Sequence, residues 1–346
     1  MSAYRFTVIM LNYNKGKFIR QAIDSVLSQK TNFDYQIVIS DDNSTDNSLN
    51  IIKEYASKYS NIYPLLSNDN ERGILKNLIR AYSLTKTDYF CVLDPDDYWT
   101  DENRLQRAFD FFETHPEYTI YFTNILCSYE DEAKLSYKYF REDGKKEASF
   151  SQDNIIDWSL LIPQTSGAFF RNVIFKKGVP DIMSKAVGTI SEASFRADAG
   201  RFMMHLQYGK AKYVNNVESV YRLGGGVWTS LSLFEQNTLN AQIYLDYNEF
   251  YNNKYKAAFF LNAYEVILKA IDCFKNDIVN KSIKPIYLEM FTNVLKNINN
   301  EELMLSYMRK REIENEKRIK LMSFKQRLRL KVFKYLYKKL HRKGLV

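Results

Sequence analysis

The sequence has few cysteines, glycines and prolines. Cysteines are needed for disulfide bonds and structural zinc sites, and glycine and proline are abundant in low-complexity proteins. Its 346 residues include 3 cysteines, which lie far apart and form no Cys-x-x-Cys pair. A disulfide framework or structural zinc site is therefore not expected, and a reducing cytoplasm fits. The 12 glycines and 6 prolines are too few for a collagen-like or low-complexity chain. No stretch approaches 18 apolar residues, so neither a signal peptide nor a membrane span is expected.

Acidic residues are missing from one segment, residues 317–346, which holds 12 Lys and Arg. The rest of the chain holds 37 basic and 41 acidic residues, so the net charge of +8 comes from the tail. A basic charge confined to one segment, with no recognised reader motif elsewhere, does not indicate nucleic-acid binding.

Apolar residues recur at four-residue steps in this tail: Phe324, Leu328, Val332, Leu336 and Leu340. This pattern is typical of a basic amphipathic helix that lies on an anionic membrane surface. It predicts a cytoplasmic protein held peripherally at the inner face of the plasma membrane. The alternative is a helix that packs its apolar stripe on the rest of the chain or on a partner.

Strand and helix patterns alternate in the first hundred residues, which predicts an α/β protein with a mostly parallel sheet flanked by helices. The predicted strands are Phe6–Leu11, Tyr35–Ser40, Ile62–Leu66 and Tyr89–Leu93. The predicted helices are Phe18–Gln29, a segment from Ser44 or Asp46 to about Tyr59, and Ile74–Leu84. Further on, residues 119–170 look rich in strands, 191–209 helical, Val214–Leu223 a strand, and 231–343 almost wholly helical.

Polar clusters follow three of these predicted strands: Asn12-Tyr13-Asn14, Asp41 to Asp46, and Asp94-Pro95-Asp96-Asp97. The carboxyl ends of parallel strands meet at one edge of a sheet. Carboxylates gathered there repel one another unless a cation offsets them. Hard oxygen ligands favour Mg²⁺ or Mn²⁺, which commonly share their coordination with substrate phosphates. The clusters predict a metal–diphosphate site, although any one of them could be a simple Asp-rich turn or cap.

The order and spacing of these clusters resemble family 2 glycosyltransferases of the GT-A fold. The segment Thr7–Gln29 is similar to that family's first strand, loop and helix, and Asp41 to Asp46 resembles its nucleoside-binding turn. Val92–Trp99 (V-L-D-P-D-D-Y-W) resembles its D-x-D motif. The resemblance is close over residues 6–115 and looser over 160–230.

The resemblance implies four parts of the chain. Residues 1–115 would be the nucleotide-sugar half of a GT-A domain and 116–230 its acceptor half. Residues 231–316 would form a helical C-terminal region, and 317–346 the basic tail.

The resemblance also implies roles around the donor. Asp42 would accept a hydrogen bond from the base, with Asp41 supporting it or contacting the ribose. The nucleoside pocket would be lined by Asn12 and Tyr13. Asp94 and Asp96 would form the D-x-D motif, with Asp96 or Asp97 reaching a Mn²⁺ or Mg²⁺ ion. Gly73, Lys76 and Asn77 would lie near the diphosphate.

The general base of the family is an Asp that opens a helix in the second half, and Asp198 matches it here. The Glu that often precedes this Asp is replaced by Ala197, and Glu192 is a rival base. The alternative for Asp198 is a plain acid of a first helical turn. The acceptor-side strand of the family begins near Gln164-Thr165-Ser166.

The segment Val220–Trp228 is similar to one that, in the family, usually has a metal-binding His after Tyr-Arg-x. This chain has Gly224 at that position, and His205 is not expected to replace the missing His. In the same segment Arg222 is a candidate for phosphate contact and Trp228 for acceptor lining. Gly224 to Gly226 could form a loop that closes over the donor, or an inert turn.

These observations predict an inverting, metal-assisted glycosyltransferase that acts from a nucleotide-sugar, expected to be a UDP-sugar. The acceptor would be a glycan or lipid-linked molecule in cell-surface polysaccharide synthesis. One alternative is a nucleotidyltransferase of sugar phosphates, for which Asn12–Lys17 is a poor triphosphate loop. The other is a non-catalytic, membrane-attached scaffold with the same fold.

Overall fold

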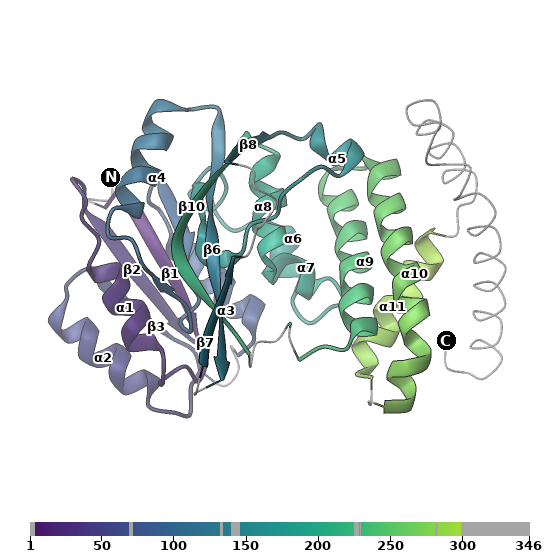
Figure 1. Cartoon of the computed structure of the whole chain (residues 1–346), viewed down its shortest axis with the longest axis horizontal. Helices are drawn as coiled ribbons and strands as arrows, with labels where there is room; N and C mark the ends of the chain where they lie inside the picture. Colours follow the sequence, from purple (N-terminus) through teal and green to yellow (C-terminus); the bar gives the residue numbers. More distant parts are fainter. Residues whose placement is uncertain are drawn as a thin grey trace. The chain divides into compact units, whose positions relative to one another are not determined.

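The computed structural model describes residues 4–68, 72–131, 134–139, 146–224, 228, 230–280 and 283–298 (Figure 1). The chain divides into two compact units, Met1–Ser230 and Leu231–Val346. The basic tail predicted over 317–346 and two of the three glycines of the predicted loop, Gly225 and Gly226, lie outside the described residues.

The first unit alternates strands and helices and then becomes richer in strands. Its strands are β1 (Phe6–Asn12), β2 (Tyr35–Asp41), β3 (Ile62–Leu66), β4 (Tyr89–Val92), β5 (Tyr98–Trp99), β6 (Tyr118–Asp131), β7 (Lys134–Tyr139), β8 (Glu147–Phe150), β9 (Ala168–Arg171) and β10 (Lys210–Leu223). Its helices are α1 (Ile19–Leu27), α2 (Ser48–Lys58), α3 (Ile74–Leu84), α4 (Arg104–Thr114), α5 (Asn154–Asp157), α6 (Asp181–Ala186), α7 (Glu192–Arg196) and α8 (Asp198–Leu206), with the 3-10 turn η2 (Thr165–Gly167) before β9.

The strands form one mixed sheet in the order β3-β2-β1-β4-β9-β6-β10-β5, with β7 paired to β6 and β8 to β10. The neighbours β3, β2, β1 and β4 are parallel, whereas β9 runs antiparallel to both β4 and β6. Asn12 pairs with Asp41 in the register of β1 and β2. The polar clusters that follow β1, β2 and β4 therefore share one edge of the sheet.

Helices cover both faces of this sheet (Figure 1). On one face, alternate residues of β1 share a core with α1, α2 and α4: Phe6, Val8 and Met10. On the other face lie α3, α6, α7 and α8 (Figure 1). Because a parallel strand is buried on both sides, β1 reads as a nearly continuous apolar run rather than an alternating one.

The elements predicted for the first hundred residues are confirmed to within four residues at their ends, the largest difference being at the start of α2, Ser48 rather than Ser44 or Asp46. The strand Ile62–Leu66 and the helix Ile74–Leu84 have the predicted bounds. The helix predicted over Phe18–Gln29 is shorter, Ile19–Leu27. Beyond β4 the sheet is mixed, since β9 is antiparallel to both of its neighbours. The sequence did not indicate this, because the periodicity of one strand does not show the direction of the strands beside it.

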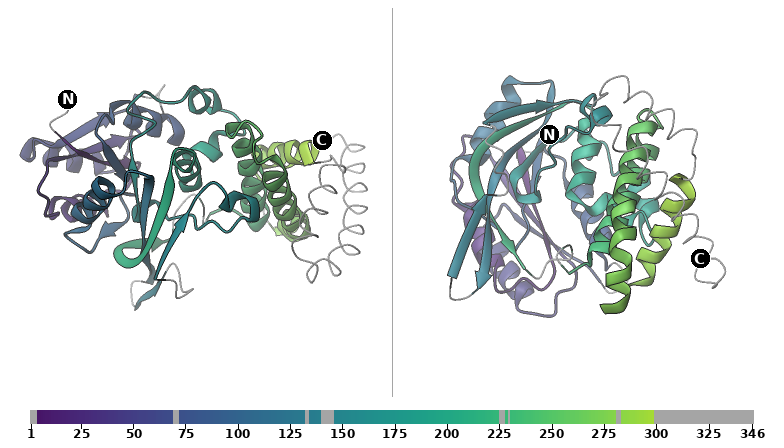
Figure 2. Two further views of the ribbon diagram at one scale, coloured as in Figure 1. Left: turned by 90° about the horizontal axis from the view of Figure 1, so that it is seen from above. Right: turned by 45° about the vertical axis from the view of Figure 1, so that its right-hand side comes forward.

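The second unit is helical in its described part. It contains α9 (Leu233–Phe250), α10 (Lys256–Asn280) and α11 (Pro285–Ile298), which lie side by side (Figures 1 and 2). A capping box opens α9: the Ser232 hydroxyl accepts from the Glu235 backbone N–H at 3.2 Å, and the Glu235 carboxylate accepts from the Ser232 N–H at 2.9 Å. None of the helices in the described ranges is long and apolar enough to cross a membrane.

Candidate active site

An acidic loop joins β4 to β5 at the edge where β1 and β2 also end. The loop carries Asp94, Asp96 and Asp97, and the Asp97 backbone N–H donates to the Asp94 carbonyl at 2.9 Å. This turn stops a fully buried strand and gathers three carboxylates over four residues.

Asp198, the first residue of α8, lies close to this loop although it is a hundred residues later in the chain. Burial raises the pKa of Asp94 well above its usual value. Neighbouring negative charges raise that pKa further, in the order Asp97, Asp96 and Asp198. Tyr221 of β10 faces the same group: burial, followed by the four carboxylates, raises its pKa to about 12. The structure thus brings the loop carboxylates and Asp198 into one site.

One carboxylate oxygen of Asp198 is held by two protein donors. The Thr165 hydroxyl donates to Oδ1, and Arg201 Nη2 donates to the same oxygen at 2.9 Å. The Asp198 side chain is 37% exposed, and no donor from the described residues reaches its Oδ2. This geometry fixes the carboxylate and leaves Oδ2 available to an incoming group.

Glu192, the rival base, is engaged elsewhere. Its Oε2 accepts from the Gly188 backbone N–H at 2.9 Å, which closes the turn before α7. Asp198, by contrast, is one of the charges that raise the pKa of Asp94. The arrangement favours Asp198 over Glu192 as the base.

Asp97 is fully buried and bonded through both carboxylate oxygens. Oδ2 accepts from the Ser166 hydroxyl at 2.5 Å and from Gln164 Nε2 at 3.1 Å, and Oδ1 accepts from the Arg222 backbone N–H at 3.0 Å. Burial raises the pKa of Asp97 to about 7, while the bond from Ser166 opposes that rise. Asp97 therefore ties the acidic loop to η2 and β10.

Asp96 lies nearer the surface and forms an ion pair with Lys15 of the β1–α1 loop. Arg222 approaches the same loop from β10: its guanidinium donates to the Asp96 carbonyl, and to Gln21 Oε1 at 2.5 Å. It also lies over the ring of Tyr98, 4.7 Å from the centroid. The phosphate role predicted for Arg222 stays a prediction.

At the end of β1 and β2, Asn12 and Asp41 are buried and bonded to each other. Asn12 Nδ2 donates to Asp41 Oδ2 at 2.6 Å, and the Ser44 hydroxyl donates to the same oxygen at 2.7 Å. These bonds hold the two strand ends and the turn after β2 together. A direct ribose contact by Asp41 remains a prediction.

Next to them in the chain, Asp42 is buried, at 8% exposure, whereas Tyr13 is exposed. Both carboxylate oxygens of Asp42 accept from the Gly73 N–H, at 3.0 and 3.1 Å. Gly73 has φ +131, a conformation that favours glycine. The Tyr13 ring is 44% exposed, and Arg72 lies over it at 5.6 Å. An exposed ring beside an acceptor carboxylate suits a nucleoside base.

The other residues near the predicted diphosphate differ in exposure. Lys76 is exposed on the first turn of α3, whereas Asn77 is buried, with Nδ2 donating to the Ser40 carbonyl at 2.9 Å. Gly224, where the family often has His, has φ +124. His205 is buried in α8 and bonds the Arg201 carbonyl through Nδ1 at 2.8 Å.

Three residues that surround the carboxylates were not singled out from the sequence: Lys15, Arg201 and Tyr221. Arg201 has a local signal, since it follows Asp198 by three residues in a helix and so shares its face. Lys15 and Tyr221 carry no such signal. A Lys in a loop is usually solvated, and a Tyr in a strand is usually packed in the core.

The donor set fits a divalent ion held by few protein ligands. The Asp94 carboxylate receives no hydrogen bond from the described residues, and the Asp96 carboxylate is paired with Lys15. Asp97 has both oxygens occupied, so its predicted metal role has less support than that of Asp96. Within the described ranges, no group of three or more His, Cys, Asp or Glu is arranged to hold a metal. One or two carboxylates with substrate phosphates are sufficient for Mg²⁺.

Known proteins match about a third of the chain. A protein of Mycobacterium tuberculosis with no assigned function is 33% identical over 130 residues, which is 38% of this chain and 38% of that one. The dTDP-rhamnosyl transferase RfbG of Shigella flexneri is 38% identical over 105 residues, covering 29% of this chain and 36% of RfbG. The chain thus spans well under two thirds of the length of these relatives.

A solved structure shares the fold over most of the chain. S. aureus TarS in complex with UDP has a TM-score of 0.53 and 16% identity, and the match covers 90% of this chain and 88% of that one. The likeness confirms the predicted GT-A fold, with helices after the sheet. The model of "Glycosyl transferase family 2" matches residues 7–179, half of the sequence. The chain belongs to glycosyl transferase family 2.

Proposed function

We propose that this protein is an inverting glycosyltransferase that moves a sugar from a nucleoside-diphosphate donor to a hydroxyl of a glycan or lipid-linked acceptor. The observation that carries the proposal is the closeness of Asp198 to the acidic loop after β4: the neighbouring hydroxyls of Thr165 and Ser166 donate to Asp198 and to Asp97 of that loop. Family membership supports glycosyl transfer. TarS, the structural neighbour solved with UDP, supports a UDP-sugar as the donor.

In this proposal Asp198 is the general base. The acceptor hydroxyl attacks the anomeric carbon on the face opposite the diphosphate, and the bond to the diphosphate oxygen breaks with its electron pair. The hydroxyl proton passes to Asp198. Thr165 and Arg201 hold Oδ1, so Oδ2 is the oxygen placed to accept that proton.

The acidic loop and the first two strand ends would hold the donor. Asp42 would accept a hydrogen bond from the base, and the exposed Tyr13 ring would stack on it. Asp96, with Asp94, would hold Mg²⁺ or Mn²⁺, which when bound offsets the charge of the leaving diphosphate as a Lewis acid. Lys15, which pairs with Asp96, would be a second cation beside that diphosphate.

A donor screen tests the proposal. Release of nucleoside diphosphate is measured for UDP-, dTDP- and GDP-sugars with Mn²⁺ or Mg²⁺, for wild type, Asp198→Asn and the matched control Glu192→Gln. We expect Asp198→Asn to lower turnover about 10²- to 10⁴-fold, since general-base catalysis contributes that much, with an unchanged donor Kd. Glu192→Gln should stay near wild type.

Three results would contradict the proposal. Undiminished turnover in Asp198→Asn would show that Asp198 is not the general base. Pyrophosphate release from a nucleoside triphosphate and a sugar 1-phosphate would indicate a nucleotidyltransferase. No release of nucleoside diphosphate from any donor would indicate a non-catalytic scaffold.

We also propose that the basic segment 317–346 docks the enzyme on the anionic inner face of the plasma membrane, where a lipid-linked acceptor for surface polysaccharide would lie. The support is its sequence: 12 cations and no acids around a four-residue apolar repeat.

A further inference from the structure

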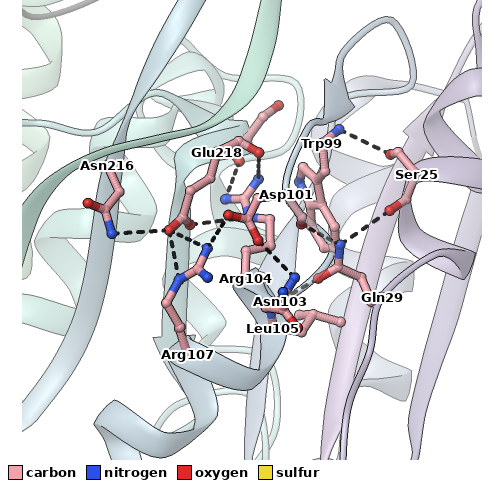
Figure 3. Close-up of polar contacts among 11 residues, drawn as sticks. Ser25, Gln29, Trp99, Asp101, Asn103, Arg104, Leu105, Arg107, Asn216 and Glu218 are labelled. Carbon is pink, nitrogen blue, oxygen red and sulfur yellow. Dashed lines mark hydrogen bonds and ion pairs between the residues drawn. The ribbon is translucent and has the colours of Figure 1, made fainter.

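Arg104, the first residue of α4, is a completely buried cation behind the acidic loop. Figure 3 shows it beside Glu218 and close to Arg107. Its guanidinium lies 4.5 Å from the ring centroid of Trp99 and 4.7 Å from that of Phe169. A flat guanidinium can stack on aromatic rings in a way that an ammonium cannot.

The guanidinium joins two segments through their backbones. Nη2 donates to the Ser166 carbonyl in η2 at 2.9 Å, and Nη1 donates to the Glu218 carbonyl in β10 at 3.4 Å. The Thr100 N–H donates to the same Glu218 carbonyl at 3.0 Å. Arg104 therefore fastens η2 and β10 to the chain that leaves the acidic loop.

Charge pairing alone does not account for this arginine. Arg104 Nε is 3.8 Å from Glu218 Oε2, and within the described residues neither atom has a hydrogen-bond partner. The other oxygen of Glu218 accepts from Arg107 Nε at 3.1 Å and from Nη2 at 2.8 Å (Figure 3). A buried pair in this geometry recovers little of the cost of desolvation. The stronger bond of Arg104 is the one to Ser166.

The turn that Arg104 holds carries partners of two site carboxylates. The Ser166 hydroxyl donates to Asp97 at 2.5 Å, and the hydroxyl of the preceding residue, Thr165, donates to Asp198. A displacement of η2 would move both hydroxyls at once. A misplacement of about 1 Å at a site can cost about 10²-fold in rate.

We propose that Arg104 is a positioning residue that orients Asp97 and Asp198 through turn η2 without touching substrate. The proposal rests on the proposed function in taking Asp198 as the base.

Arg104→Met tests it, because Met keeps the length and packing of the side chain but removes the fork of donors. The matched control is Arg171→Met. Arg171 donates to the Tyr118 carbonyl at 3.1 Å and lies 5.4 Å from the ring of Tyr89, but none of its contacts is to η2 or the acidic loop. The measurements are hydrogen exchange of the Ser166 and Gly167 amides, and kcat and KM with the donor found in the screen.

For Arg104→Met we expect amide exchange at Ser166 and Gly167 to rise at least about tenfold and kcat to fall about 10- to 100-fold, with KM within about threefold. Arg171→Met should lower Tm but leave both kcat and the amide exchange at Ser166 and Gly167 as in wild type. If Arg104→Met does not fold, Arg104→Lys should show the same pattern at smaller size, since it keeps the charge but not the fork.

Exchange at Ser166 and Gly167 equal to wild type would overturn the proposal, as would a loss of kcat no larger than in Arg171→Met. Exchange needs no donor, so it decides the role of Arg104 even if no sugar nucleotide is turned over and the proposed function fails.

Discussion

His205 is a titratable side chain that serves the core rather than the chemistry. It lies among the rings of Phe90, Phe170 and Phe175, and burial lowers its pKa to about 3. The neighbouring Arg201 guanidinium lowers this pKa further, while the bond to the Arg201 carbonyl opposes the shift. This placement agrees with the expectation that His205 does not replace the His missing at Gly224.

The low pKa of His205 predicts a pH dependence of stability. In the unfolded chain His takes up a proton below about pH 6.5, whereas the folded state keeps His205 neutral down to about pH 3. The unfolded state therefore binds more protons in this window, and stability falls as the pH drops through it. Between pH 8 and pH 5 we expect His205 to remove about 2 kcal/mol from the free energy of unfolding.

Urea unfolding of His205→Asn and wild type at pH 8 and pH 5 checks this prediction. The Asn variant should lose about 2 kcal/mol less than wild type over that range, whatever its absolute stability. Exposed His115 supplies the control, and His115→Asn should leave the pH dependence as it is. An unchanged pH dependence in His205→Asn would show that His205 is protonated in the folded state.

Helix α8 owes the position of Asp198 to a close approach between helices. Gly200 lies on the first turn of α8, and a Cβ there would overlap the Ser194 carbonyl oxygen of α7 and lie 3.3 Å from the Phe195 Cα. Both neighbours are backbone atoms, which cannot turn away as a side chain can. The short α7–α8 pair therefore packs closely only with glycine at this position.

Gly200→Ala is expected to destabilise the protein by about 1–3 kcal/mol, the usual cost of overpacking. In an unconstrained helix the same change would stabilise by up to about 1 kcal/mol. Whether Gly200→Ala lowers or raises the free energy of unfolding therefore shows whether the close approach exists. Because Asp198 is two residues away, kcat should fall as well. Chemical denaturation and the donor assay measure the two effects, and a stabilised, fully active variant would refute the close approach.

The chain divides into two compact units, and the charge asymmetry lies in the C-terminal part of the second, Leu231–Val346. The described part of the second unit is a set of packed helices opened by the Ser232–Glu235 capping box. The basic segment 317–346 belongs to the chain outside the described residues, so its expected role rests on sequence.

Vesicle flotation tests that role. Each Lys or Arg near an anionic surface contributes about 1 kcal/mol, so 12 cations suffice for reversible binding even after large losses to screening. We expect the full chain to float with anionic vesicles at low salt, less so at high salt, and not with neutral ones. Equal flotation of a chain ending at residue 316 would assign the binding to another surface.

The strands, helices and acidic turns of the first half could be read from the sequence, because burial of one face imposes a local period and turns need particular residues. The resemblance to family 2 glycosyltransferases, and not these local patterns, predicted that Asp198 belongs to one site with Asp42 and Asp96. The sequence could not show that Asp97 would bond Ser166, that Thr165 would hold Asp198, or that Arg104 would be buried between two rings. The bonds of Asp97 and Asp198 join residues 69 and 33 positions apart, and Arg104 lies 65 positions from Phe169. Only the pairing of β9 with β4 and β6, and of β10 with β5 and β6, brings these segments together.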